Sequence, residues 1–256
     1  MKGFAFVLLC ALVAVQGRHR GELSRQAAAL GEQPWVVHLR IAVETSGNLN
    51  SCVGSLIDNQ WVLTAASCLS GSRFIWVRYG AVDVIRPSLV TENSNIRIHP
   101  QYSWATGAFN VGLISINRFI QSTDNISPVP LVGDVYDSAI FCGYGAREDG
   151  QPGEQLSCYP GAVEERDTGR LVFNGEGAEA TKYDIGAPIV SNGVQVAIVT
   201  GVAGDYSAEL WAVASIKDWL ENMTGINFSP NDSESGSDEE EEAAAEIAPE
   251  AVRFVN

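Results

Sequence analysis

The sequence predicts an all-β fold. Three features support this: short apolar runs rich in β-branched and aromatic residues, turn-forming Gly, Pro, Asn and Ser between those runs, and only one segment with clear helical periodicity. The chain has 256 residues, of which 46% are hydrophobic, so it can bury a core without help from a metal. The spacing of the apolar runs is typical of a β-barrel or a β-sandwich.

The expected elements follow one another along the chain, with strands first and one helix last. The clearest expected strands are residues 35–39, 61–63, 73–79 and 194–199. The helix is expected over residues 215–223, where Ile216, Trp219 and Leu220 recur at helical spacing and Ser215 stands in the N-cap position. The sequence therefore predicts a β body closed by a C-terminal helix.

The first 17 residues have the pattern of a secretory signal. Lys2 precedes an apolar stretch at residues 4–15, and the small residues Val15 and Gly17 fit the positions before a cleavage site. Twelve apolar residues are too few to cross a ~30 Å hydrocarbon layer, so we expect export of a secreted, extracellular protein without a membrane span. Candidate glycosylation sites begin at Asn125, Asn222 and Asn231.

The last 28 residues, 229–256, carry nine acidic residues and a single basic one, Arg253. Like charges at this density repel one another, so we expect a disordered acidic tail. Its role is either to keep the chain soluble or to act as a loose arm for calcium or a basic partner. Ser237 lies before acidic residues and is a candidate phosphorylation site. The net charge of −15 makes nucleic acid an unsuitable partner.

A hairpin with a cysteine on each side carries a family resemblance. The stretch from Cys52 to Ile57, followed by Trp61 to Cys68, resembles the first signature of the trypsin and chymotrypsin family of serine proteases. Further stretches resemble that family in the same order, namely residues 31–35, 98–102, 109–114, 143–145, 184–190 and 216–220. The resemblance implies two packed antiparallel six-stranded β-barrels with a cleft between them. The implied divisions are residues 1–17 as signal peptide, 18–27 as a short N-terminal segment, 28–122 and 123–228 as the two barrels, and 229–256 as the acidic tail.

The resemblance also marks where the catalytic residues of that family stand, and this chain departs from all three. Ser67 replaces the histidine, Asn110 the aspartate and Ile185 the nucleophilic serine. Tyr183 stands where a glycine helps to form the oxyanion hole, and Glu179 falls at the floor of the specificity pocket. The side chains of Ile185, Ser67 and Asn110 cannot supply attack, proton transfer and imidazolium stabilisation. The resemblance therefore implies a pseudoprotease.

Asp184 is retained, although nothing in the sequence supplies the new amino terminus that pairs with this aspartate in active members of the family. An interior carboxylate needs a partner. His38 is our candidate, and the two would form a permanent zymogen-like lock. The alternative is that His38 is an ordinary half-buried histidine on a strand. A cysteine that frames the specificity pocket in the family is replaced by Thr181.

Four cysteines remain once Cys10 leaves with the signal, an even number for an oxidising compartment. The resemblance implies a Cys52–Cys68 disulfide. Cys142 and Cys158 would form a second one if their Cα atoms lie within about 7 Å of each other. A metal site is disfavoured because the chain has neither paired C-x-x-C motifs nor clustered histidines. We therefore expect no metal and no cofactor.

Three functions follow from these features. The first is a secreted, non-catalytic homologue that binds extracellular proteins, such as proteases or other components of an immune cascade, as a cofactor, decoy or regulator. The second is a hydrolase that uses Asp184 or Glu179 as a general base. The third is an extracellular structural or calcium-binding protein that uses its acidic tail. The sequence favours the first function and leaves the oligomeric state open.

Overall fold

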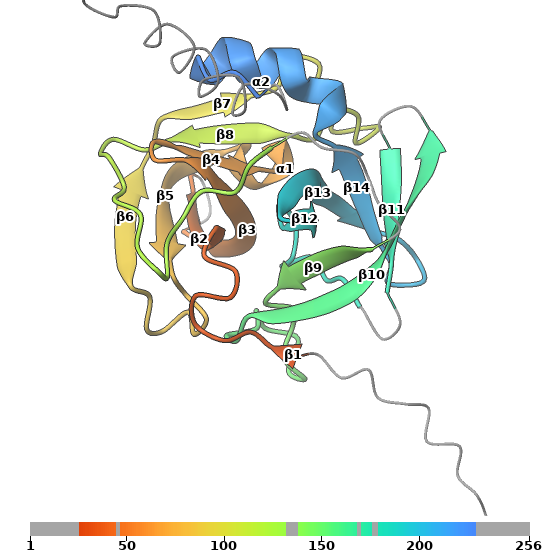
Figure 1. The fold of residues 1–256 in the computed structure, drawn as a ribbon, viewed down its shortest axis with the longest axis horizontal. Coiled ribbons are helices and arrows are strands. Elements are labelled where there is room, and N and C mark those ends of the chain that lie inside the picture. Colours follow the sequence, from red (N-terminus) through yellow and green to blue (C-terminus); the bar gives the residue numbers. More distant parts are fainter. Residues whose placement is uncertain (1–25, 45–46, 132–137, 168–169, 176–178, 229–256) are drawn as a thin grey trace, which may run out of the picture.

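The computed structural model describes residues 26–44, 47–131, 138–167, 170–175 and 179–228. The predicted signal peptide, Asn231, Ser237 and the acidic tail lie outside these residues. Two curled antiparallel sheets stand side by side, and the C-terminal helix α2 lies across one end of the first (Figure 1). The fold class predicted from the sequence is confirmed. No helix in the described part of the chain is long and apolar enough to span a membrane.

The first half of the molecule is a seven-stranded sheet that curls without closing. Its strand order is β6-β5-β2-β3-β4-β8-β7, and the edge strands β6 and β7 are not paired with each other. The strands are β2 (Val36–Val43), β3 (Leu49–Asp58), β4 (Trp61–Thr64), β5 (Ser72–Tyr79), β6 (Leu89–Asn93), β7 (Ile96–Ile98) and β8 (Gly112–Ser115). The resemblance implied a six-stranded barrel here, and the structure refines this to a curled half-barrel of seven strands.

Alternate side chains of β2 and β5 face the core of this half, although Val36 and His38 on β2 are buried as well. Leu39 and Ile41 on β2, and Ile75 and Val77 on β5, are almost fully buried. Because successive side chains of a strand point to opposite faces, the residues between them lie on the outer face of the sheet. Pairing of β2 with β5 thus aligns an outer row of polar side chains, among them His38.

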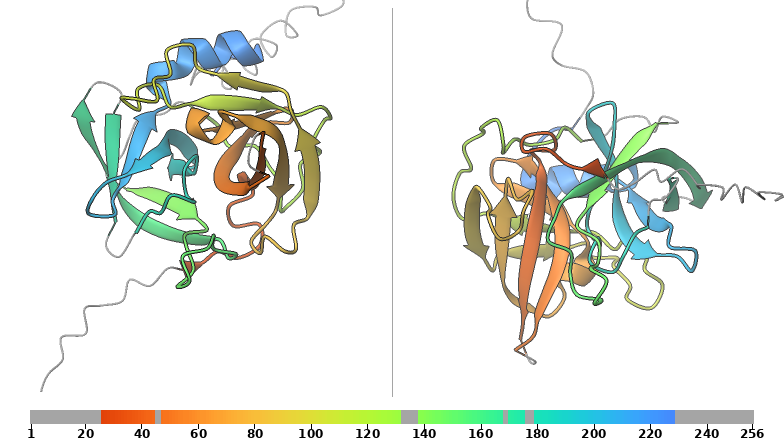
Figure 2. Two further views of the ribbon diagram at one scale, coloured as in Figure 1. Left: turned by 180° about the vertical axis from the view of Figure 1, so that it is seen from behind. Right: turned by 90° about the horizontal axis from the view of Figure 1, so that it is seen from below.

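The second half closes into a six-stranded barrel, because β9 pairs with both β10 and β12. Its strands are β9 (Ala139–Gly143), β10 (Ser157–Asp167), β11 (Arg170–Asn174), β12 (Pro188–Ser191), β13 (Val194–Val202) and β14 (Ala208–Ala212). Phe141 and Phe173 are each 1% exposed and meet edge to face inside this barrel. The short strand β1 (Gln26–Ala27) extends its edge next to β10, so part of the expected N-terminal segment belongs to this sheet. Figure 2 shows the two halves from behind and from below.

The helices are short, and one of them was not predicted. Helix α1 (Ala66–Leu69) follows β4, while the 3₁₀ turn η1 (Ala214–Ile216) leads into α2 (Lys217–Thr224). The N-cap prediction is wrong: the hydroxyl of Ser215 donates to the carbonyl of Ala212, and α2 begins two residues later. Ile216 and Leu220 are buried in a cluster shared with the first half, so the last helix ties the two halves together.

Both predicted disulfides are present. Cys52 on β3 is bonded to Cys68 on α1, with 6.3 Å between their Cα atoms. Cys142 and Cys158 face each other across β9 and β10, with 4.1 Å between their Cα atoms, inside the distance that the prediction required. Each half of the molecule therefore carries one disulfide.

Candidate functional site

Ser67 and Asn110 lie together, as the family resemblance implied for their positions. The side-chain oxygen of Asn110 accepts a hydrogen bond from the Ser67 backbone N–H at 2.8 Å. The Asn110 side-chain nitrogen donates to the Ser67 hydroxyl at 3.1 Å and to the Thr200 carbonyl at 3.0 Å. Asn110 is 5% exposed, so these bonds replace the water it would otherwise contact. Ser67, Asn110 and Thr200 thus form a neutral hydrogen-bonded set.

Ile185 lies at the seam between the two halves. Its half-buried side chain packs against the core of the first half and against the core of the second. Its backbone carbonyl accepts a hydrogen bond from Val53 of β3 at 2.9 Å. The next residue, Gly186, has φ of +88°, and a β-carbon there would collide with Val53 and Thr64. The turn therefore holds Ile185 firmly, with a hydrocarbon side chain at the position of the nucleophile.

The backbone N–H of Tyr183 is bonded inside its own loop. It donates to the hydroxyl oxygen of Thr181 at 3.2 Å, while the phenol hydroxyl of Tyr183 donates to the Gly150 carbonyl at 2.8 Å. An oxyanion hole needs N–H groups that point at the substrate oxygen. The Tyr183 N–H is directed toward its own loop instead.

Asp184 is 1% exposed, and its partners come from neighbouring loops. One carboxylate oxygen accepts from the Gly145 N–H at 2.7 Å. The other accepts from the backbone N–H and the hydroxyl of Thr181, both at 2.8 Å. The carboxylate also lies so close to Gly143 that a β-carbon on that residue would collide with it. Thr181 is a residue that the sequence reasoning missed as a partner, although its position three residues before Asp184 is a local signal for such a contact.

The predicted lock between His38 and Asp184 is not formed. The Asp184 carboxylate accepts from Gly145 and Thr181, and among the described residues His38 Nδ1 has no hydrogen-bond partner. The ring of His38 instead meets Tyr144 edge to face, with 5.1 Å between ring centroids. Burial, followed by the charges of Arg78 and Arg40, lowers the pKa of His38 to about 3, so its imidazole is neutral. The histidine lies on β2, opposite Arg78 of β5.

A cleft of about 410 Å³ brings several of the predicted positions together. Ser67, Tyr183 and Ile185 line it, with the Cys52–Cys68 disulfide beside them. Glu179 does not belong to this cleft, and its side chain is exposed to solvent. An exposed side chain cannot be the floor of an enclosed pocket, so the structure does not support that placement of Glu179.

The remaining predictions concern a metal site and the candidate glycosylation sites. Within the described residues, no three His, Cys, Asp or Glu side chains are grouped to hold a metal ion. Asn222 is exposed on α2, and Asn125 is half-buried in the turn before Ile126. Both remain predicted glycosylation sites.

The two-part β fold with a cleft between its halves is the fold of the chymotrypsin-like serine proteases. A solved structure of HL collagenase has the same fold: its TM-score is 0.73 at 24% identity, over 80% of this chain and 99% of that chain. The sequence profile of the trypsin family matches residues 23–220. The chain belongs to the trypsin family.

Individual relatives agree with this assignment. Serine protease 28 of Mus musculus is 31% identical over 129 residues, which cover 48% of this chain and 47% of the mouse protein. Kallikrein-12 of Homo sapiens is 28% identical over 251 residues, which cover 84% of this chain and 95% of the human protein. This chain thus spans about half of the mouse relative and nearly all of the human one.

Proposed function

We propose that this member of the trypsin family does not cleave peptides and acts by binding other proteins outside the cell. The observation that carries the proposal is Ile185, whose hydrocarbon side chain stands in the nucleophile position and packs into both cores. Loss of the nucleophile alone costs on the order of a million-fold in turnover in proteases of this mechanism. An attacking oxygen would need space that this side chain fills.

Two further contacts support the proposal. The Ser67 and Asn110 side chains are bonded to each other and to Thr200, and a hydroxyl and an amide cannot act as the proton-accepting base that this reaction needs. The Tyr183 N–H is bonded to Thr181, which withdraws a donor from the position of the oxyanion hole. Attack, proton transfer and charge stabilisation each lack their usual group.

The proposed setting is extracellular, and the proposed partners are proteases or other components of a protease cascade. Two disulfides favour an oxidising compartment. A chain that keeps a protease surface without the reaction can compete for a protease's substrates or inhibitors, or hold a protease in place as a cofactor. Its role in such a cascade would be that of a decoy, cofactor or regulator.

The test is chemical labelling of the purified full chain with a fluorophosphonate probe, together with turnover of fluorogenic peptides. We expect no adduct and no turnover above buffer, with an active trypsin as the positive control. The matched variant is Ile185→Ser, which restores a hydroxyl but leaves Ser67 and Asn110 in place, and it should also stay inactive. A covalent adduct on a residue lining the cleft of the unaltered chain would refute the proposal. Capture from extracellular fluid would then identify the bound proteins.

A further inference from the structure

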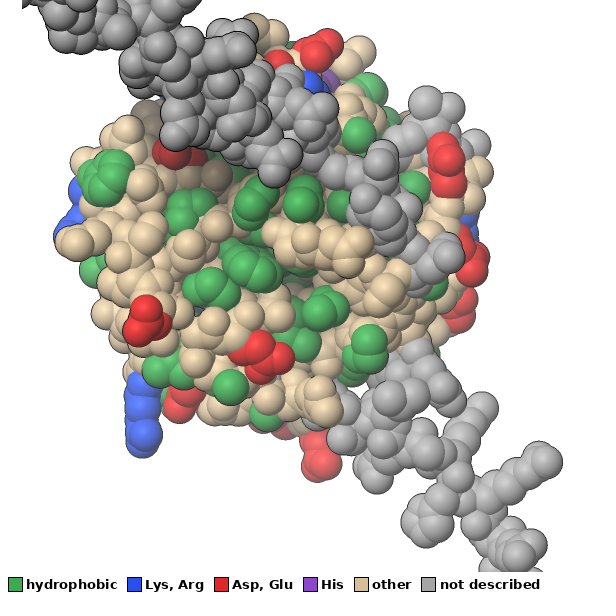
Figure 3. Space-filling view, viewed as in Figure 1, with side chains coloured by type: hydrophobic (Ala, Val, Ile, Leu, Met, Phe, Trp, Pro, Cys, Tyr) green, Lys and Arg blue, Asp and Glu red, His purple; other side chains and the backbone are tan. Residues whose placement is uncertain are grey.

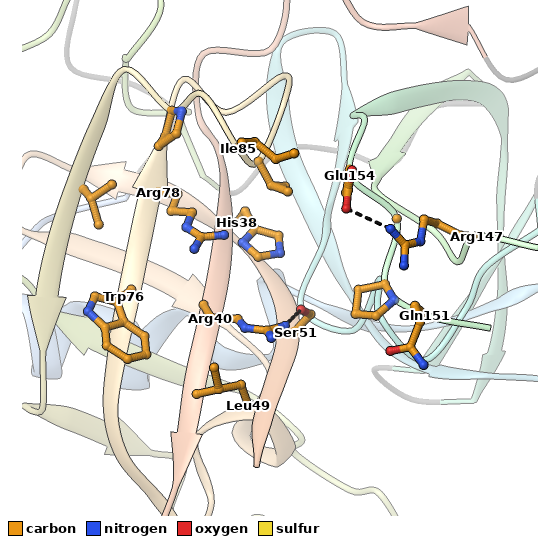
Figure 4. A pocket seen from close by; sticks show the side chains of 15 residues that line it. His38, Arg40, Leu49, Ser51, Trp76, Arg78, Ile85, Arg147, Gln151 and Glu154 are labelled. Atoms are coloured by element: carbon orange, nitrogen blue, oxygen red, sulfur yellow. Dashed lines mark hydrogen bonds and ion pairs between the residues drawn. The ribbon is translucent and has the colours of Figure 1, made fainter. Parts of the chain in front are cut away.

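A second cavity, a groove of about 760 Å³, continues from the cleft across the outer face of the first sheet. The two cavities share lining residues from both halves, among them Arg40, Ser51 and Pro152. Figure 4 shows the groove between strands that carry His38, Arg40 and Arg78 and a loop of the second half that carries Arg147. The groove therefore adjoins the cleft and shares part of its lining, while His38, Trp76 and Arg78 line the groove alone.

Strand register gathers positive charge in this groove. His38 on β2 stands opposite Arg78 on β5, and Arg40 stands opposite Trp76 on β5 and Ser51 on β3. These side chains share the outer face of the sheet, since side chains alternate along a strand. Sheet pairing thus places two guanidinium groups beside one buried imidazole.

The two arginines have no carboxylate partner. Among the described residues, neither Arg40 nor Arg78 has an Asp or Glu oxygen within 4.0 Å, whereas Arg147 is paired with Asp149 at 3.0 Å and with Glu154 at 2.9 Å. Arg40 donates to the hydroxyl of Ser51 at 3.0 Å. Burial and the nearby Arg40 charge lower the pKa of Arg78, as expected for like charges held together. In a chain with a net charge of −15, this is an uncompensated cationic site.

His38 is an independent sign that the groove accepts a ligand. The residue is 3% exposed and lines the groove, and within the described part of the chain its Nδ1 atom has no hydrogen-bond partner. Buried polar atoms are nearly always bonded, and an exception requires an explanation such as a missing ligand. A peptide lying in the groove can supply both a group for this imidazole and carboxylates for the arginines.

The rim of the groove suits a ligand that has apolar side chains as well as acidic ones. Ile85, Leu49 and Val90 line it and are 69%, 44% and 43% exposed. The acidic segment of this chain, residues 232–250, has that composition: a run of acidic residues at 238–242 is followed by alanines and Ile247. The groove and the acidic segment are therefore complementary in charge, and both carry apolar side chains.

The acidic segment is also long enough to reach the groove. It follows Phe228, which is 8% exposed and whose N–H donates to Glu221 of α2 at 3.0 Å. Twenty-eight residues span up to roughly 90 Å when extended, while a body of this size has a radius of gyration of about 17 Å. A tethered segment acts at an effective concentration of the order of millimolar, so it has an advantage over free acidic peptides.

We propose that this groove is a binding site for a carboxylate-rich peptide segment, and that the chain's own acidic segment, residues 232–250, occupies it. Carboxylates of the segment pair with Arg40 and Arg78, and the segment covers His38. A protein partner that binds there must first displace the segment.

The test compares full-length chains by the NMR signals of the histidine rings, of which there are only three, from His19, His38 and His99. The tail variant changes Asp238 to Asn and Glu239, Glu240, Glu241 and Glu242 to Gln. We expect the His38 signal to differ between the unaltered chain and the tail variant, and hydrogen exchange over residues 76–90 to be at least threefold faster in the tail variant. Raising the salt concentration to about 0.5 M should bring the unaltered chain toward the variant, because salt screens such pairs.

A second arm measures binding of a labelled peptide with the sequence of residues 229–250 to the tail variant. Adding Arg40→Gln and Arg78→Gln should weaken that binding at least tenfold. Arg73→Gln is the matched control: Arg73 is exposed on the same strand as Arg78 but does not line the groove, so it should change binding less than twofold. The His38 signal of the tail variant should return to its original position when the peptide is added.

An identical His38 signal and identical exchange in the unaltered chain and the tail variant would overturn the proposal, even if the free peptide binds. Equal binding by the Arg73→Gln variant and the groove variant would overturn it as well. These outcomes are separate from the proposed function, because peptide turnover by this chain would refute that function without changing any of these measurements.

Discussion

The loop around Asp184 and the strand face around His38 bury polar side chains to nearly the same extent, at 1% and 3% exposure, but satisfy them in opposite ways. Asp184 accepts three hydrogen bonds from residues of nearby loops. Among the residues that the structure describes, His38 Nδ1 has no hydrogen-bond partner, and the ring lies near Arg40 and Arg78, neither of which has a carboxylate partner. The fold itself supplies hydrogen-bond partners for Asp184, whereas we propose that a bound peptide supplies them around His38.

This difference indicates that the Asp184 loop supports the fold, whereas the groove around His38 can bind a ligand. Ser67, Asn110 and Thr200 resemble the Asp184 loop, because their polar groups are also hydrogen-bonded to one another. Changes in the loop or the cleft should therefore lower the stability of the fold. Changes in the groove should cost little stability at neutral pH and act mainly through charge.

The largest effect should come from Asp184→Ala. This change leaves the Gly145 N–H, the Thr181 N–H and the Thr181 hydroxyl without an acceptor in a buried place, so we expect a loss of about 3 kcal/mol or more in the free energy of unfolding. Urea denaturation measures it. The control is Asp205→Ala, which removes an exposed carboxylate bonded to Ser207 and should leave the midpoint almost unchanged. Similar urea midpoints for Asp184→Ala and Asp205→Ala would mean that the buried Asp184 supports the fold no more than an exposed carboxylate does.

The next effect should come from Asn110→Leu in the cleft. Leucine keeps the volume of the side chain but leaves the Ser67 N–H and the Thr200 carbonyl unpaired, so we expect a loss of about 2 kcal/mol. Ser67→Ala removes only the hydroxyl, so it should cost roughly half as much, again by urea denaturation. Equal stability of Asn110→Leu and the unaltered chain would mean that the network does not support the cleft.

The groove should show its effect in the pH dependence of stability. The folded pKa of His38 is about 3, so between pH 6.5 and 3 the unfolded chain binds a proton that the folded chain does not. Stability is fully present above pH 6.5 and falls as the pH falls, by roughly 2 kcal/mol between pH 7 and pH 5.

This contribution is best measured in the tail variant, where the proposed acidic ligand is weakened. Adding His38→Phe should remove most of the 2 kcal/mol loss, as judged by urea denaturation at pH 7 and pH 5. In the unaltered chain the loss should be smaller, because bound carboxylates favour the charged imidazole. A pH profile unaffected by His38→Phe would show that this histidine is not held neutral by its surroundings.

The smallest effect should come from Arg78→Gln in the tail variant. Removing one of two like charges relieves the repulsion with Arg40, so we expect a gain of a few tenths of a kcal/mol at low salt that disappears near 0.5 M salt. Arg73→Gln on the same strand should give no such salt-dependent gain. A clear loss of stability on Arg78→Gln would indicate a structural partner for that side chain.

The sequence predicted the parts of this molecule that depend on short motifs. The hairpin from Cys52 to Cys68 identified the family, one disulfide and the position of Ser67. Cys142 and Cys158 were matched by elimination, and the register of β9 and β10 explains why they meet. The positions of Asn110 and Ile185 followed from their flanking residues.

The sequence could not predict contacts between distant parts of the chain. Asn110 meets Ser67 and Thr200 across 43 and 90 residues, and no local pattern indicates such partners. The lock was assigned to His38 because it is polar and lies on the first long strand, but strand alternation directs its side chain to the outer face beside Arg78. The sequence also did not indicate that only the second half closes into a barrel, since closure depends on β9 pairing with two strands at once.

The seam residue Ile185 has a consequence for how this chain can change over generations. Its carbons fill space shared by the two halves, so a serine at this position would leave that space poorly filled and weaken the cohesion between them. A serine at this position would therefore lower stability, while Ser67 and Asn110 remain bonded to each other and to Thr200. Further substitutions that refill the space would be needed to keep both the hydroxyl and the stability of the fold.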